Sequence, residues 1–351
     1  MADDSGASDP FAVTLDAERT PGADAPPDRT GPSACYVIDR HGSEQVRFSR
    51  ETVEARLSSG SFFWLDLDQP SAADFEILRD VFKFDPLAVE DSEHFDQRAK
   101  IDDYDDFIFV VVYGATPDQD RLVEVHCFYS ERFLVTIHRD DCPAFAEIRR
   151  RYQRRDSAID RPSLLLYRVV DGLTDSFFPI LAAFDDRIDE LEDSIFRRAD
   201  DRQLQEMFGM KRLLVGMRKA VTPQRDAFAG LMGGIAELPG LGEGDERYFR
   251  DVYDHLIRIS DLIDSYRDLL TGAMDVYLST VSNRLNVVMK QLTVIATIFL
   301  PLTFITGFFG QNFRWMVSHI GSMAVFLTLG VGAEIAIVVF LLTSFKRRGW
   351  F

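Results

Sequence analysis

Two long apolar stretches near the end of the chain constrain its fold more than any other feature. Residues 292–309 and 320–342 contain 18 and 23 residues, and from Gln291 to Phe345 the only acid is Glu334. A helix needs about 20 residues to cross a hydrocarbon core of about 30 Å. The sequence therefore predicts two membrane-spanning helices attached to a soluble part that makes up most of the chain.

The flanking cations indicate how these spans are oriented. Arg284 and Lys290 precede the first span and three cations at 346–348 follow the second, whereas the loop at 310–319 carries only Arg314. Short loops rich in Lys and Arg remain in the cytoplasm. We therefore expect a multi-pass protein of the cell (inner) membrane with both termini cytoplasmic.

Composition excludes several classes of protein. The chain has 57 acidic and 39 basic residues, a net charge of −18, and a nucleic-acid binder would need a basic face. Its three cysteines form no Cys-x-x-Cys pair, which argues against a disulfide framework and a zinc site and favours reduced cytosolic thiols. Residues 1–34 lack the pattern of a cleavable signal peptide and are expected to form a disordered acidic tail.

Hydrophobic periodicity divides the rest of the chain. Short strand and helix patterns alternate up to about residue 140 and include the continuous apolar run FIFVVVY. After residue 140, apolar residues recur every three or four positions, which is typical of helices. No stretch of turn residues interrupts the helical pattern between Glu246 and Phe309. The predicted divisions are an α/β cytoplasmic layered domain at 35–142, a cytoplasmic helical region at 143–245, a stalk helix continuing into the first span at 246–309, the external loop at 310–319, the second span at 320–345 and a basic cytoplasmic end at 346–351.

A stripe of small and polar residues follows one face of the long predicted helix. Its steps are close to the 3.5-residue repeat of helices that pack around an axis. Such a stripe is typical either of close helix packing or of the wall of a water-filled path. A path would require several chains, since two helices cannot enclose one. The stripe contains Asp275, Ser282, Asn286, Met289, Thr293, Ala296, Leu300, Thr303, Gly307 and Gly310.

The end of this helix carries a recognisable motif. The segment TVIATIFLPLTFITGFFGQNF, with Gly310-Gln311-Asn312, resembles the pore helix and Gly-x-Asn signature of the CorA family of divalent-cation channels. VEDSEHFDQRAKIDDYDDFIFVVVY, YFRDVYDH and the final KRRGW are similar to family segments in the same order. The resemblance covers residues 35–351.

The resemblance implies a funnel-shaped homopentamer in a lipid membrane that takes up Mg²⁺, with Co²⁺ and Ni²⁺ as accompanying ions. It implies that Asn312 forms a ring at the outer mouth that holds a hydrated cation, beside the carbonyl of Gly310. Mg²⁺ loses its water reluctantly, and carboxamide oxygens can accept hydrogen bonds from its bound waters. The further pore positions implied are a hydroxyl ring at Thr303, a hydrophobic constriction at Met289, Leu292 and Leu300, and polar and acidic rings at Asn286 and Asp275.

Regulation is also implied by the resemblance. In the family, Mg²⁺ bound between neighbouring subunits in the cytosol holds the channel closed. Asp91 and Asp251 occupy the matching positions, so we expect intracellular Mg²⁺ to inhibit its own entry. The alternative interpretation is that both are ordinary surface acids.

The sequence departs from the family pattern at two places near the mouth. Gln311 replaces the usual methionine of the signature, and the external loop carries Arg314 where the family often has an acid after a Met-Pro pair. A second carboxamide would add a ligand ring or merely replace a packing side chain, and Arg314 would repel cations. The departures therefore make ion selectivity a separate question from the fold.

Three alternatives remain open. Glu334 inside the second span is expected to be protonated, hydrogen-bonded to the first helix or near the inner interface, and a role in proton coupling would indicate proton-assisted Zn²⁺ transport, as in the ZntB branch of the superfamily. A membrane-anchored cation sensor would not need the polar stripe. An enzyme is disfavoured, because no phosphate-binding loop, nucleophile triad or metal-ligand histidine pair is visible.

Overall fold

The computed structural model describes residues 34–39, 42–116, 121–140, 142–152, 161–236, 238–242, 244–311, 314–319 and 322–350. They form two compact units. The first contains the described residues up to Ser194 and those from Asp200 to Met274, and the second contains Ile195–Ala199 and the described residues from Asp275 onward.

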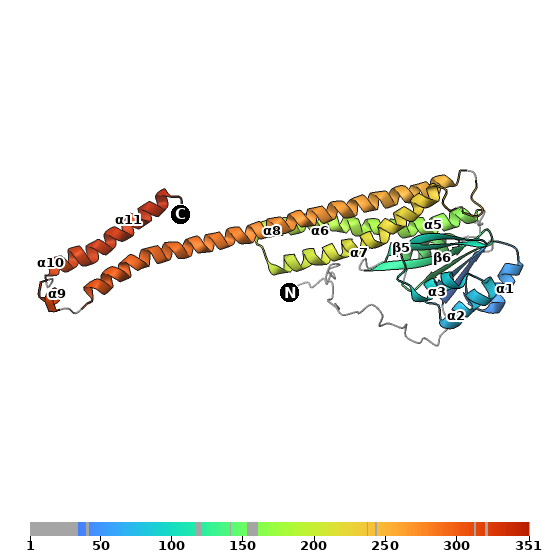
Figure 1. The fold of residues 1–351 in the computed structure, drawn as a ribbon, viewed down its shortest axis with the longest axis horizontal. Helices are drawn as coiled ribbons and strands as arrows, with labels where there is room; N and C mark the ends of the chain where they lie inside the picture. Colours follow the sequence, from blue (N-terminus) through green and yellow to red (C-terminus); the bar gives the residue numbers. More distant parts are fainter. Residues whose placement is uncertain are drawn as a thin grey trace, which may run out of the picture. The chain divides into compact units, whose positions relative to one another are not determined.

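The first unit contains a seven-stranded sheet (Figure 1). Its strand order is β2-β1-β3-β7-β6-β5-β4, and every neighbouring pair is antiparallel except β3 with β7. The predicted run FIFVVVY is the buried strand β5. The strands are β1 (Ala34–Asp39), β2 (Gly42–Arg47), β3 (Phe63–Asp68), β4 (Lys100–Tyr104), β5 (Phe107–Ala115), β6 (Leu122–Tyr129) and β7 (Phe133–His138).

One face of the sheet is covered by α1 (Arg50–Ser58), α2 (Ala72–Ile77), the π-helical segment η1 (Leu78–Phe82) and α3 (Pro86–His94). Because side chains alternate along a strand, Phe63, Leu65 and Leu67 of β3 enter this core. The start of α3 is fixed by Asp85, whose side chain accepts a hydrogen bond from the Leu87 amide at 2.9 Å.

The opposite face packs against α4 (Pro143–Tyr152), α5 (Pro162–Asp175) and α7 (Asp201–Met232). β5 approaches α5 closely, and a Cβ at Gly114 would lie 2.7 Å from the Leu173 side chain. The buried Gln224 of α7 accepts a hydrogen bond from the Tyr113 amide at 2.7 Å. The fold is therefore a layered α/β domain, as the sequence predicts.

A break after α5 separates it from the next helix. α5 ends at Asp175, and α6 (Phe177–Arg197) starts after Ser176. The Ser176 hydroxyl donates to the Leu173 carbonyl at 2.5 Å and accepts from the Ala115 amide at 2.7 Å, which ties this break to β5. Buried residues then recur at helical spacing along α6, α7 and the first part of α8 (Glu246–Phe309).

The second unit contains the remainder of α8 and the helices that follow it. The predicted uninterrupted helix is present as α8, with Pro301 inside it. After it come α9 (Arg314–His319), α10 (Met323–Val325), the π-helical segment η2 (Phe326–Gly332) and α11 (Ala333–Arg347). Two segments, Glu246–Phe309 and Met323–Arg347, are long and apolar enough to cross a membrane.

Candidate ion pathway and cation sites

Within the second unit, α8 has a covered face and an exposed face. Val294 is 9% exposed, and Thr297, Ile298 and Ile305 are partly covered. The last part of the chain contacts this helix at two levels, where the Lys290 ammonium donates to the Gly349 carbonyl at 3.3 Å and the Thr306 hydroxyl lies 2.8 Å from a Glu334 carboxyl oxygen. The covered positions Val294, Ile298 and Ile305 recur at helical spacing and therefore lie on one side of α8.

The predicted pore stripe lies on the exposed face. Met289 is 59%, Leu292 58% and Leu300 72% exposed, and a Cβ added at Gly307 would meet no atom within 4 Å. The other described members of the stripe are also exposed, namely Asp275, Ser282, Asn286, Thr293, Ala296, Thr303 and Gly310. The described residues of the same chain thus leave the stripe uncovered, and it is free to face other chains or water.

Two threonines of the stripe present acceptor oxygens on this face. The Thr293 hydroxyl donates to the Met289 carbonyl and the Thr303 hydroxyl to the Phe299 carbonyl, both at 2.8 Å. A hydroxyl has one proton and two lone pairs, so each oxygen remains an acceptor after this bond. An acceptor of this kind suits the hydrogens of water bound to a cation.

The C-terminal end of α8 supplies negative partial charge. The Gly310 amide donates to the Thr306 carbonyl at 2.9 Å, and the Gln311 amide to the Phe308 carbonyl at 3.3 Å. The last carbonyls of a helix carry the negative end of its dipole, which favours cations. Asn312, the predicted cation ligand, lies outside the described residues, whereas Gln311 is described and exposed.

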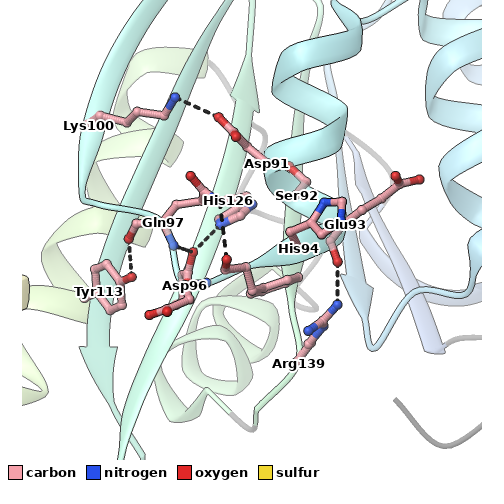
Figure 2. A network of polar contacts seen from close by, with 12 residues as sticks. Asp91, Ser92, Glu93, His94, Asp96, Gln97, Lys100, Tyr113, His126 and Arg139 are labelled. Carbon is pink, nitrogen blue, oxygen red and sulfur yellow. Dashed lines mark hydrogen bonds and ion pairs between the residues drawn. The ribbon is translucent and has the colours of Figure 1, made fainter. Parts of the chain in front are cut away.

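Asp91, the first predicted regulatory residue, lies on α3 and is paired within the chain. Its carboxylate accepts a hydrogen bond from the Lys100 ammonium at 2.8 Å (Figure 2). Lys100 also lies 2.6 Å from Asp102. Burial alone would lower the pKa of Lys100, but its bonds to Asp102 and Asp91 outweigh this and raise the pKa. Lys100 is therefore a charged partner that any cation binding at Asp91 would have to displace or accommodate.

A polar network around Glu124 fixes the chain just after α3. Phe95 and Asp96 both have positive φ, 52° and 60°. The Glu124 carboxylate accepts hydrogen bonds from the Asp96 amide at 2.7 Å and the Gln97 amide at 2.9 Å, and its oxygen lies 2.7 Å from His126 Nε2. Such backbone angles are costly unless the surroundings hold them.

Arg139 and Tyr113 complete this network (Figure 2). The Arg139 guanidinium donates to the Glu93 carbonyl at 2.6 Å and lies over the Phe95 ring, and the Tyr113 hydroxyl donates to the Gln97 carbonyl. The last turn of α3, which carries Asp91, is therefore held against the sheet.

Asp251, the second predicted regulatory residue, lies beside a cluster that the sequence interpretation missed. Asp171 and Asp175 of α5 and His255 of α8 each place a ligand atom within 4.8 Å of the others. His255 Nδ1 is 3.1 Å from Asp175 and 3.7 Å from Asp171, and Asp251 is 3.9 Å from His255 Nε2. Two carboxylates with an imidazole form a donor set that suits a divalent cation.

The charges in this cluster are poorly compensated. Burial, followed by the neighbouring Asp175, raises the pKa of Asp171 to about 6. Burial and Asp251 raise the pKa of Asp175, against the opposing effect of His255. Among the described residues, one buried Asp171 oxygen has no hydrogen-bond partner. Crowded carboxylates with unsatisfied oxygens favour a bound cation.

One signal in the sequence could have revealed this cluster. Asp171 and Asp175 are four residues apart, as are Asp251 and His255, so each pair lies on one helical face. Nothing in the local pattern says that α5 and α8 pack together there. Within one chain Asp91 of α3 pairs with Lys100 of β4, whereas Asp251 lies near His255 on α8, and each remains a predicted ligand.

Comparisons with known proteins identify the class of the chain. Residues 59–347 match the family described as CorA-like Mg²⁺ transporter protein. The putative metal ion transporter YfjQ of Bacillus subtilis is 35% identical over 294 residues, which cover 83% of this chain and 90% of YfjQ. The cobalt/magnesium transport protein CorA of Thermotoga maritima is 36% identical over 280 residues, covering 77% of each chain.

A solved structure shows the same fold. The CorA magnesium transporter from Methanocaldococcus jannaschii has a TM-score of 0.76 at 22% identity, covering 91% of this chain and 99% of that one. More distantly, the zinc transport protein ZntB of Pectobacterium carotovorum is 27% identical over 199 residues, 57% of this chain and 59% of ZntB. The chain is therefore a cation-transporting membrane protein and not an enzyme. It belongs to the CorA-like Mg²⁺ transporter family.

Proposed function

We propose that the chain is one subunit of a homopentameric channel that admits Mg²⁺, with Co²⁺ and Ni²⁺ as accompanying ions, across the cell (inner) membrane. Both termini lie in the cytoplasm, consistent with the cations at 346–348. The observation that carries the proposal is the exposure of the stripe on α8, which the described residues of the chain's own second membrane helix leave uncovered. Two helices enclose no path, so the exposed stripes of several chains must meet around an axis.

In this channel the ion enters with its water. The helix C-termini and Asn312 attract and hold the hydrated cation, and Thr303 offers acceptor oxygens below them. Met289, Leu292 and Leu300 form apolar rings that close the path by excluding water when they approach one another. Asn286 and Asp275 then receive the ion at the cytosolic end.

Intracellular Mg²⁺ regulates this path through the cytosolic acids. We place the regulatory ions at Asp91 and Asp251 and extend the second position to Asp171, Asp175 and His255, which surround Asp251 within one chain. A cation shared with a neighbouring subunit holds the soluble parts together, and its loss leaves like charges facing each other.

Replacing Asp251 by alanine is expected to weaken Mg²⁺ protection of the full-length protein against proteolysis, raising the Mg²⁺ concentration that gives half protection by about tenfold. His255→Ala is expected to weaken protection by Co²⁺ and Ni²⁺ more than protection by Mg²⁺, since imidazole suits the transition metals and Mg²⁺ prefers oxygen. The measurement is limited proteolysis across a titration of each metal.

Asp268→Ala is the matched control for that titration, because Asp268 is an acid of the same helix whose side chain is 79% exposed. It should leave all three titrations unchanged. Equal protection in wild type and Asp251→Ala would remove Asp251 from the regulatory site.

The test of the proposed function is ion flux into liposomes that contain the purified protein. Mg²⁺, Co²⁺, Ni²⁺ and Zn²⁺ are compared with and without a pH gradient. We expect Mg²⁺ flux that needs no pH gradient. Absence of flux for all four ions would support a membrane-anchored cation sensor instead.

Proton-assisted Zn²⁺ transport is the second candidate, favoured by Glu334 in the second span and by the ZntB relative. It predicts Zn²⁺ flux that follows the pH gradient and is lost in Glu334→Gln. Zn²⁺ flux that needs no pH gradient, or that Glu334→Gln retains, would exclude it.

A further inference from the structure

Glu334 is the only ionisable residue within the two apolar stretches. No Asp, Glu, Lys, Arg or His occurs between Lys290 and Arg314, and Glu334 alone interrupts the sequence between His319 and Lys346. Its carboxyl oxygen Oε1 lies 2.8 Å from the hydroxyl of Thr306 on α8. Glu334 is therefore hydrogen-bonded to the first membrane helix, which was one of the expectations from the sequence.

The hydrogen bonds of Thr306 indicate where the proton lies. Its Oγ1 is 2.9 Å from the Leu302 carbonyl and 2.8 Å from Glu334, but a threonine hydroxyl has only one proton to donate. Four other threonines of the two spans donate to the carbonyl four residues earlier, namely Thr293, Thr303, Thr328 and Thr343. If Thr306 does the same, a proton on the Glu334 carboxyl group completes the hydrogen bond between Thr306 and Glu334.

Thr306 Oγ1 lies within hydrogen-bond distance of both the Leu302 carbonyl and Glu334 Oε1. With a neutral Glu334 both contacts can be hydrogen bonds, because the carboxyl group would donate to Thr306 while Thr306 donates to Leu302. An ionised Glu334 would instead need the Thr306 proton, which would turn away from Leu302. Hydrocarbon offers no water to compensate an ionised carboxylate, so the neutral arrangement is favoured while the two helices stay in contact.

The backbone before Glu334 contributes to this contact. η2 (Phe326–Gly332) is π-helical and ends two residues before Glu334. Each π-helical turn holds roughly one residue more than an α-helical turn, which rotates all later side chains by roughly 100° about the axis. The π-helical segment therefore sets the face on which Glu334 meets α8.

The position of Thr306 links this contact to the proposed pore. Thr306 directly precedes Gly307 and follows Thr303 by three residues, so it lies at the flank of the stripe. A change in its contact with the second helix would turn or shift the segment that carries Thr303 and Gly307.

We infer that Glu334 and Thr306 form a proton-binding site between the two membrane helices. With the proton bound, the carboxyl group ties the second helix to the flank of the pore helix. When the proton leaves to water, the carboxylate requires hydration, the contact loosens and the pore segment of α8 is released. The effect on the pore rests on the proposed cation transport, whereas the proton site itself does not.

Infrared difference spectroscopy of the full-length protein in liposomes tests the site directly. Spectra at acidic and alkaline pH should contain the carbonyl band of a protonated carboxyl group that Glu334→Gln removes. Thr306→Val should shift this band because the hydroxyl partner is lost, and Thr306→Ser, which keeps the hydroxyl, should restore it towards the wild-type position. Spectra of wild type and Glu334→Gln without any difference in the carboxyl region would overturn the inference, as would a band that Thr306→Val leaves in place.

Cation flux provides the second readout. In liposomes the Mg²⁺ flux of the wild type should change with pH, and Glu334→Gln, whose amide group can donate to Thr306 at any pH, should lose that dependence while still transporting. Retained pH dependence in Glu334→Gln would contradict the link to the pore. Absence of flux in every variant would count against the proposed function alone, because the infrared result stands independently of transport.

Discussion

Asp66→Ala is expected to lower the free energy of unfolding of the soluble part by about 3–5 kcal/mol, the usual cost of removing one member of a buried ion pair. Asp66 is completely buried in β3. Its carboxylate forms an ion pair with Arg149 of α4, lies 3.2 Å from His138 Nε2 of β7, and accepts a hydrogen bond from Thr136 at 2.8 Å. Alanine would leave the half-buried guanidinium of Arg149 and the buried Nε2 of His138 without the carboxylate that they share.

Protonation of this network gives the prediction a pH dependence. Burial alone would raise the pKa of Asp66, but His138, Arg149 and Thr136 outweigh it and lower the pKa. Burial alone would lower the pKa of His138, but Asp66 outweighs it and raises the pKa. His138 Nδ1 also donates to the Asp140 carbonyl at 2.8 Å, which leaves Nε2 to face the carboxylate.

The directions of the two pKa shifts define the pH range in which the network contributes its full stability. A lowered carboxyl pKa contributes stability that is present above the ordinary Asp value and lost as pH falls through the folded-state pKa. A raised His pKa contributes stability that is present below the ordinary His value and lost as pH rises through the folded-state pKa. Both contributions are complete between about pH 4 and about pH 6.5.

Denaturant unfolding of the detergent-solubilised full chain, followed by circular dichroism within that window, measures the effect. Asp268→Ala, at an exposed acid, is the control and should change stability by less than about 1 kcal/mol. A loss for Asp66→Ala no larger than that of the control would show that the buried network does not stabilise the domain.

Asn312→Ala is expected to reduce Mg²⁺ flux into liposomes by about tenfold or more, equivalent to at least about 1.4 kcal/mol. In the proposed pentamer the substitution removes one carboxamide from every subunit at once. The ring would then have no side-chain oxygens to accept hydrogen bonds from the waters that Mg²⁺ retains. The hydrated ion would lose its binding position at the mouth, while the path below it would remain open.

Gln311→Met provides the matched control at the neighbouring position, since it restores the residue usual in the family signature. We expect flux within about threefold of wild type, because a packing role is open to either side chain. Wild-type flux in Asn312→Ala would remove Asn312 from the proposed mouth. Loss of flux in Gln311→Met instead would assign the ligand role to Gln311.

The elements with strong patterns could be predicted from the sequence. α8 and the second apolar helix follow from length and hydropathy, and β5 from its continuous apolar run. β4, with the sequence KIDDY, was missed because an edge strand needs little apolar surface. The π-helical segments η1 and η2 were also missed, because residue patterns of this length do not distinguish π-helical from α-helical turns.

A candidate site could be predicted from the sequence where all its residues lie on a single helix. The stripe lies on one helix, so its common face follows from spacing alone, and the exposed positions of Met289 and Leu300 agree with it. The cluster at Asp171 and His255 joins residues 84 positions apart, and the bond between Thr306 and Glu334 joins two spans. Such sites depend on how helices pack against one another, which local patterns do not encode.

The most direct test of the central claim, that the exposed face of α8 lines a water-filled path, is thiol modification of Thr303→Cys and Ile305→Cys during Mg²⁺ flux. The native cysteines should not interfere, since all three are buried, and burial raises the pKa of Cys35 to about 12. A charged, membrane-impermeant thiol reagent should stop flux through Thr303→Cys, more slowly when Mg²⁺ is present, and leave Ile305→Cys unaffected because that position is partly covered. Flux that is stopped only in Ile305→Cys, or in neither variant, would contradict the account.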